Sequence, residues 1–156
     1  MTKRSFPTVL TVCLILVGAL SVAPARASLA ENPQLTYDQM LSIAETQFEI
    51  AKLLIKEGRY DRVLPEMRKI LDLNFQGENE QLVAKSSSWI AKALVENKQM
   101  TLAHILLDET LDRMKQKQNI AALLKIKAFV YKSDGKYQKA IETYERAVEI
   151  ERQGAQ

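Results

Sequence analysis

The side chains that could carry catalysis are few in this 156-residue sequence, and they stand far apart along it. His104 is the only histidine and Cys13 the only cysteine. The serines at 86–88 have no general base beside them in the sequence, which nucleophilic catalysis requires. The acids within 108–112 share a helical face, a pattern that is usually solvated, and the sequence contains no glycine-rich phosphate loop and no calcium loop. We therefore expect no enzyme activity, no metal site and no cofactor.

The amino-terminal residues have the layout of an export signal. Lys3 and Arg4 precede an uncharged apolar run over 6–23, and Ala25 and Ala27 supply the small residues that signal peptidase recognises. We expect a signal peptide over residues 1–27 and a periplasmic or secreted location for the remainder. The alternative is an uncleaved membrane anchor facing the periplasm, because the run approaches the roughly 20 residues that cross a bilayer.

Removal of this leader changes the charge of the chain. Lys3, Arg4 and Arg26 leave with it, so the 22 basic residues fall by three and equal the 19 acids. A formally neutral remainder argues against nucleic-acid binding, which depends on a net basic surface. Cys13 also leaves, so the exported part can form no disulfide and must be stabilised by packing alone.

Helical periodicity extends from Thr36 to Glu151 and predicts an all-α fold. Thr36 and Gln39 have the spacing of a capping box, which predicts where the first helix begins. Five interruptions divide the pattern into six helices, at residue 58, 74–79, 97–98, 116–119 and 134–135.

Two of the interruptions have the same composition. Gly58 and Gly135 suit a left-handed helix end, and each is followed two residues later by a tyrosine. Lys98 stands at the equivalent place in a third turn. Small residues precede each turn, where they would let two helices approach closely: Ala51, Ala91 and Ala128. Packing positions follow each turn: Val63, Met67 and Ile70; Ala103, Leu107 and Thr110; Ala140, Tyr144 and Ala147.

This arrangement resembles the tetratricopeptide repeat family, whose unit is a helix-turn-helix of 34 residues. The third unit carries the resemblance best, through Leu124, Ala128, Tyr131, Ala140, Tyr144 and Ala147. The resemblance implies a helical-hairpin solenoid of three repeats, at 43–78, 79–118 and 119–153, between an extension at 28–42 and a tail at 154–156. It also implies a non-catalytic module that binds another protein.

In such arrays the first helix of each pair lines a concave groove. The resemblance implies a partner-binding stripe of Phe48, Lys52, Ile55, Lys56, Lys85, Lys92, Val95, Lys125, Phe129 and Lys132. Spacing supports the first four independently, because they lie at i, i+4, i+7 and i+8 on one helical face. We expect an acidic peptide or helix as the partner. Alternatively, the lysines are ordinary solvated residues, and Trp89 beside the stripe belongs to the edge of the core.

No capping helix follows the last repeat, so we expect Ile141 and Val148 to remain uncovered. An apolar solenoid end in water favours association. This leaves two further hypotheses. The chain could be a structural subunit of an envelope assembly that docks or self-associates through this face, or a chaperone-like holder of exported chains.

Overall fold

The computed structural model describes residues 35–154, so the expected leader and its cleavage site lie outside the described part. Within that part the chain forms six α-helices, two short 3-10 helices and no strand, which confirms the predicted all-α class. The α-helices are α1 (Tyr37–Lys56), α2 (Val63–Asp72), α3 (Glu80–Glu96), α4 (Met100–Leu111), α5 (Lys117–Ser133) and α6 (Tyr137–Gly154). The 3-10 helices are η1 (Tyr60–Arg62) and η2 (Gly77–Asn79). None of the helices described is long and apolar enough to span a membrane.

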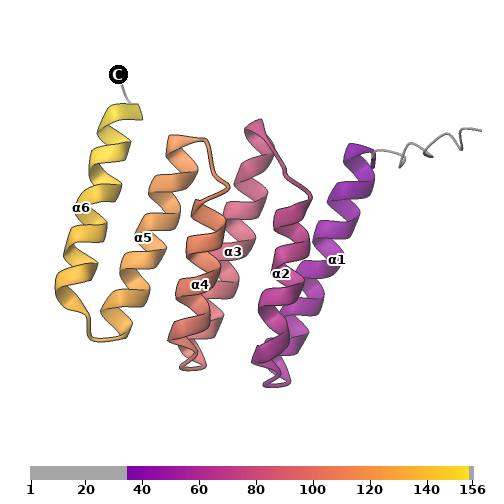
Figure 1. Cartoon of the computed structure of the whole chain (residues 1–156), viewed down its shortest axis with the longest axis horizontal. Helices are drawn as coiled ribbons and strands as arrows, with labels where there is room; N and C mark the ends of the chain where they lie inside the picture. Colours follow the sequence, from indigo (N-terminus) through magenta and orange to yellow (C-terminus); the bar gives the residue numbers. More distant parts are fainter. Residues whose placement is uncertain (1–34, 155–156) are drawn as a thin grey trace, which may run out of the picture. The chain divides into compact units, whose positions relative to one another are not determined.

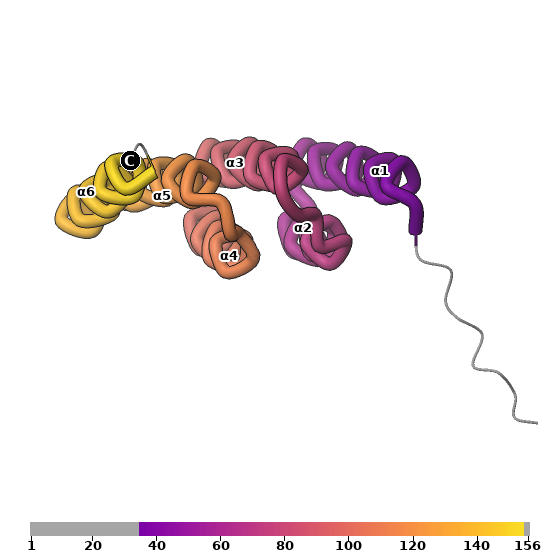
Figure 2. Tube along the Cα trace, turned by 90° about the horizontal axis from the view of Figure 1, so that it is seen from above, coloured from indigo at the N-terminus to yellow at the C-terminus, as the bar shows by residue number. Residues whose placement is uncertain are grey.

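Successive helices form antiparallel hairpins that stack side by side (Figure 1). Figure 2 shows α1, α3 and α5 in one row, the first layer, with α2 and α4 below this row as a second layer. The last helix, α6, does not join the second layer but extends the first layer beyond α5 (Figure 2). Its two buried residues are Ala140 and Ala147, so a seam of small side chains lets α6 pack along α5.

The three turns within the hairpins have the same backbone conformation. Gly58, Lys98 and Gly135 are left-handed, with φ of 74°, 61° and 72°. Each turn also closes with the same hydrogen bond from the next N–H to a carbonyl five residues earlier: Arg59 to Leu54 at 2.8 Å, Gln99 to Leu94 at 2.8 Å and Lys136 to Tyr131 at 2.9 Å. This bond is the signature of the Schellman motif. The predicted equivalence of the three turns is confirmed.

The core forms where the pattern placed it, with one exception. Ala51, Ala91 and Ala128 are fully buried, and eight of the nine positions predicted after the turns are also buried. The exception is Tyr144, which is 39% exposed. Because α6 packs along α5 and does not enter the second layer, more of its circumference remains in water.

Two arginines join the helices of the second layer. Arg68 of α2 donates to both carboxylate oxygens of Glu109 on α4, at 2.9 and 2.6 Å. Arg113, just beyond α4, donates to the carbonyl oxygen of Leu71 at 2.9 Å and lies 3.0 Å from the carboxylate of Asp72. These contacts hold α2 and α4 in register across successive hairpins.

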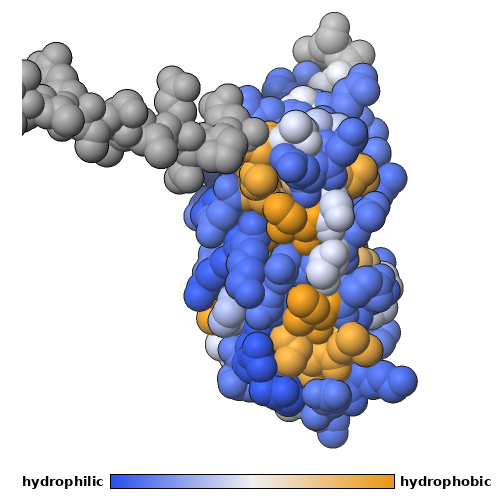
Figure 3. Space-filling model, turned by 90° about the vertical axis from the view of Figure 1, so that its right-hand side faces the viewer, coloured by the Kyte–Doolittle hydropathy of each residue, from blue (hydrophilic) through white to orange (hydrophobic). Residues whose placement is uncertain are grey.

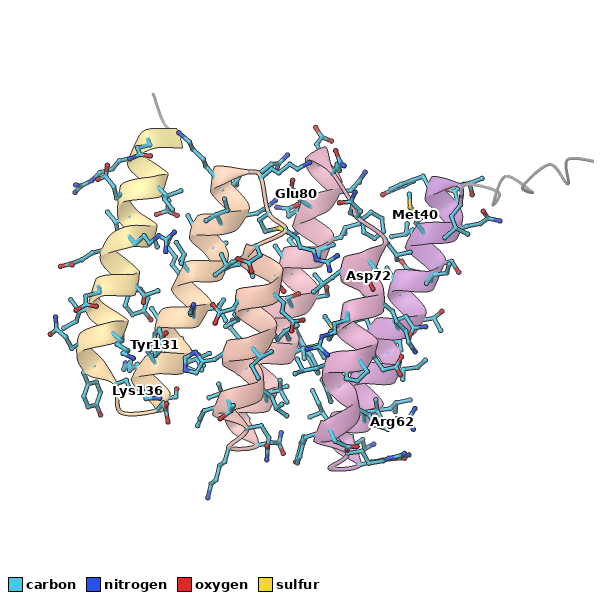
Figure 4. The ribbon with its side chains drawn as sticks, in the orientation of Figure 1. Met40, Arg62, Asp72, Glu80, Tyr131 and Lys136 are labelled. Atoms are coloured by element: carbon cyan, nitrogen blue, oxygen red, sulfur yellow. The ribbon has the colours of Figure 1, made fainter. Side chains whose placement is uncertain are left out.

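A buried carboxylate anchors the turn between α4 and α5. Glu80, at the start of α3, is only 1% exposed and accepts the backbone N–H groups of Lys115 and Gln116, both at 3.0 Å (Figure 4). Burial raises the pKa of this carboxyl, but the two backbone donors, the side chain of Asn119 and the charge of Lys115 together outweigh burial, so the net pKa is lowered. Glu80 therefore remains ionised and fixes the position at which α5 begins.

The left-handed turn at Lys98 predicts that glycine stabilises the protein there. The left-handed conformation costs an L-residue about 1–2 kcal/mol, and glycine removes this cost. The greater conformational freedom of glycine in the unfolded chain offsets about 0.5–1 kcal/mol of the stability gained. We expect Lys98→Gly to raise the free energy of unfolding by about 0.5–1 kcal/mol, measured by urea denaturation.

Gly58→Ala and Gly135→Ala are the matched controls for this change. No heavy atom lies within 4 Å of a Cβ added at either position, so the only cost is backbone strain. Each should lower the free energy of unfolding by about 1 kcal/mol. A lower urea midpoint for Lys98→Gly would contradict the shared turn geometry.

The Glu80 anchor predicts a pH-dependent contribution to stability. Because the folded-state pKa is lower than the unfolded value, the contribution is complete above the unfolded pKa of about 4.3 and is lost as pH falls through the folded pKa. We expect Glu80→Gln to cost about 1–3 kcal/mol at pH 7 and much less near pH 3, by denaturant unfolding at both pH values. The control is Glu78→Gln at an exposed neighbour, and an equal loss from both variants would refute the anchor.

Candidate functional site

Among the reactive side chains identified in the sequence, His104 and Ser87 lie in packed positions, whereas Cys13 lies outside the described residues. The imidazole of His104 lies against the ring of Tyr131, with centroids 4.3 Å apart, and neither ring nitrogen has a hydrogen-bond partner. Burial, and secondarily the charge of Lys136, lowers the pKa of His104, so the ring is neutral at pH 7 (Tyr131 and Lys136 in Figure 4). Ser87 is buried and accepts a hydrogen bond from Thr110 at 3.0 Å. These contacts give His104 and Ser87 structural roles.

The acidic residues of α4 are paired with cations from neighbouring helices. Arg68 lowers the pKa of Glu109 by hydrogen bonding, and Asp108 forms an ion pair with Lys127 of α5. Sequence reasoning interpreted this cluster as solvated and missed both partners, because they come from other hairpins. Over residues 35–154, no group of three or more histidine, cysteine or acidic side chains is placed to hold a metal ion.

An aromatic and cationic cluster lies where α1 meets α3. The rings of Phe48 and Trp89 are 5.7 Å apart in an edge-to-face arrangement, at 79°. The Nζ of Lys52 lies 5.1 Å from the centroid of Phe48 and 5.8 Å from that of Trp89. Trp89 is nevertheless 48% exposed, so part of a large aromatic surface remains open to solvent. Such a residue is a common anchor in protein interfaces.

A mostly apolar hollow of about 330 Å³ lies beside this cluster, between α1 and α3. Its walls include Leu41, Ala44, Phe48, Phe75, Leu82 and Trp89. Leu82 is 42% exposed, although it is a large apolar side chain. The hollow therefore presents apolar surface to water, as a ligand-binding pocket does.

A second hollow of about 310 Å³ lies between α3 and α5 and has a more polar lining than the first. Its lining includes Gln81, Lys85, Lys92, Gln118 and Asn119, and it contains no acidic side chain. Lys85 and Trp89 line both hollows. The middle of α3 thus separates an apolar site from a basic one.

The predicted stripe is only partly present at this surface. Ile55 and Val95 are 7% and 8% exposed and belong to the core, so they offer no foothold to a partner. Their helical positions point toward neighbouring helices, which the spacing alone did not show. Phe129 is 38% exposed but lines neither hollow.

The six predicted lysines divide into two groups. Lys52 is paired with Glu49 at 2.5 Å, and Lys125 with Glu151 of α6 at 2.6 Å. The other four are exposed and have no ion pair within residues 35–154: Lys56, Lys85, Lys92 and Lys132. The available positive charge is therefore centred on α3, on both sides of Trp89.

Both ends of the hairpin stack also expose apolar side chains. Figure 3 faces the α1 end, where orange patches alternate with polar surface, and Leu53 of α1 is 58% exposed. At the other end, Ile141 and Val148 of α6 are 52% and 42% exposed, as expected from the sequence.

The family comparison concerns the last hairpin. The model of the tetratricopeptide repeat matches residues 126–153, from the middle of α5 through most of α6. The third hairpin is thus similar to a tetratricopeptide repeat over these residues. Tetratricopeptide repeats generally bind other proteins or peptides and are typically non-catalytic. No curated protein and no solved structure matches the chain.

Proposed function

We propose that this protein is a non-catalytic binding module that holds an acidic segment of a partner protein against α1, α3 and α5. The observation that carries the proposal is the surface of α3, where Lys85 and Lys92 lack internal counter-charges on both sides of the exposed Trp89. The apolar run and small residues of the leader support an exported protein, periplasmic or secreted, or one held at the membrane by an uncleaved leader.

The lysines and the aromatic side chains of this surface contribute differently to binding. An exposed ammonium-carboxylate pair contributes only about 0–1 kcal/mol and weakens with salt. Full burial of a large apolar side chain contributes about 1.5–3 kcal/mol and does not depend on salt in this way. The aromatic cluster of Phe48 and Trp89 would therefore supply most of the affinity, and the lysines would select an acidic partner and accelerate its association.

The charge of α3 predicts salt-sensitive binding that charge reversal weakens. We expect Lys85→Glu with Lys92→Glu to weaken binding of a partner captured from envelope extract by about 10-fold to 100-fold at low salt, because two attractions become repulsions. The difference should shrink at high salt, measured by calorimetry with the captured partner.

The matched control reverses two lysines that line neither hollow, Lys98→Glu with Lys139→Glu, and so changes the net charge equally. If both double variants lost the same binding affinity, the effect would come from the net charge of the protein and not from the α3 surface. Wild-type affinity of the α3 variant at both salt levels would exclude a basic binding surface.

A second candidate function, as a structural subunit, is favoured by one observation on α6. Four large side chains lie at i, i+4, i+7 and i+11 on one stripe and are 39–65% exposed: Tyr137, Ile141, Tyr144 and Val148. This is the spacing of a coiled-coil seam. We propose a second copy of the chain as the occupant, because a seam of this spacing packs against an identical helix.

The stripe predicts concentration-dependent self-association of the protein without its leader. Ile141→Lys with Val148→Lys should give a monomer at concentrations where the unmodified protein associates, because each lysine places a charge in an apolar seam. Sedimentation velocity over a concentration series measures this. Ile105→Lys is the control, since Ile105 is a 37% exposed apolar residue on α4. A monomeric unmodified protein throughout the series would rule out the seam.

A further inference from the structure

We infer that the ligand of the α3 surface is an extended segment carrying an apolar side chain and, three residues away, an aspartate or glutamate. The apolar side chain would occupy the hollow between α1 and α3, and the carboxylate the hollow between α3 and α5. This inference rests on the proposed function and specifies the chemistry of the partner.

The hollow between α1 and α3 selects an apolar side chain. Its walls are mostly aliphatic and aromatic, with Glu45, Lys85 and Ser86 as the polar part of the lining. Its volume of about 330 Å³ lies within the range of about 300–1,000 Å³ that is usual for ligand pockets. Leu82 and Trp89 remain 42% and 48% exposed without a ligand. An inserted leucine or phenylalanine would remove apolar surface from water on both sides of the contact.

The hollow between α3 and α5 selects a carboxylate by charge complementarity. Lys85 and Lys92 lie one above the other at i and i+7, and neither has an ion pair within the described residues. Gln81, Gln118 and Asn119 add amide groups to the lining, which includes no acidic side chain. A basic or apolar side chain would meet like charge or leave both lysines without a counter-charge.

The spacing of three residues follows from the helices between which the hollows lie. The hollows flank α3, so they are separated by about one interhelical distance, roughly 8–10 Å. In the polyproline II conformation residues i and i+3 lie on the same face about 9.3 Å apart. In a β-strand the same-face residues are about 6.6 Å or 13.2 Å apart and fit less well.

Trp89 makes this inference measurable. It is the only tryptophan of the chain, and it lines both hollows. Its fluorescence therefore reports occupancy of either hollow without a label.

The test uses synthetic proline-rich peptides with blocked ends, each with one leucine and one aspartate. The two residues are separated by one, three or five positions, and in further peptides asparagine replaces the aspartate or serine the leucine. We expect the peptide with spacing three to change Trp89 fluorescence with a dissociation constant about tenfold lower than the spacing-one, asparagine and serine peptides, a difference of about 1.4 kcal/mol.

Protein variants assign each contact to its hollow. Ala44→Leu fills the apolar hollow and should remove the preference for leucine over serine while the preference for aspartate remains. Lys92→Gln should remove the preference for aspartate over asparagine while the preference for leucine over serine remains. Lys132→Gln is the matched control, because Lys132 is exposed, lacks an ion pair and lines neither hollow. If Ala44→Leu does not fold, Leu82→Gln at the exposed edge of the same hollow provides the same measurement.

The outcomes separate this inference from the proposed function. Binding that depends on aspartate but not on leucine or on spacing would overturn the two-hollow ligand and leave the acidic partner intact. No fluorescence response to any peptide would also overturn the inference. The proposed function itself fails if a captured protein partner is insensitive to reversal of Lys85 and Lys92, or loses the same affinity when Lys98 and Lys139 are reversed.

Discussion

Close packing at one alanine in each hairpin underlies the rest of this structure. Ala51, Ala91 and Ala128 are fully buried just before the three turns, where any larger side chain would separate the paired helices. The left-handed residue a few positions later ends the first helix of each hairpin in the same backbone conformation and reverses the chain. With no cysteine in residues 35–154, this repeated packing supplies the stability that a disulfide would supply elsewhere.

Long-range polar contacts then set how one hairpin sits on the next. Arg68 and Glu109 join α2 to α4, while Glu80 holds the turn before α5 by two backbone hydrogen bonds. The third hairpin closes differently, because the alanine seam of α6 lies along α5 and α6 extends the first layer. The stack therefore presents α1, α3, α5 and α6 on one side, with the stripe of α6 at one end.

The candidate binding surface results from what this packing leaves unpaired. Two of the six predicted lysines are neutralised by glutamates of the same chain, and the two on α3 are not. Trp89 lies between them on α3, packs edge-to-face with Phe48 and remains 48% exposed. An apolar hollow and a basic hollow on either side of one helix form a surface that can distinguish partners by both shape and charge.

The sequence by itself determined the local features of this protein. Six helices, the left-handed turns at Gly58 and Gly135 and the capping box at Thr36 could all be predicted, because periodicity and glycine chemistry act within a few residues. Only the tertiary structure decided that Ile55 and Val95 are buried, that Lys125 is paired with Glu151 of α6, and that Tyr144 is exposed. Those outcomes depend on the distance and angle between helices far apart in the chain, which no local pattern encodes.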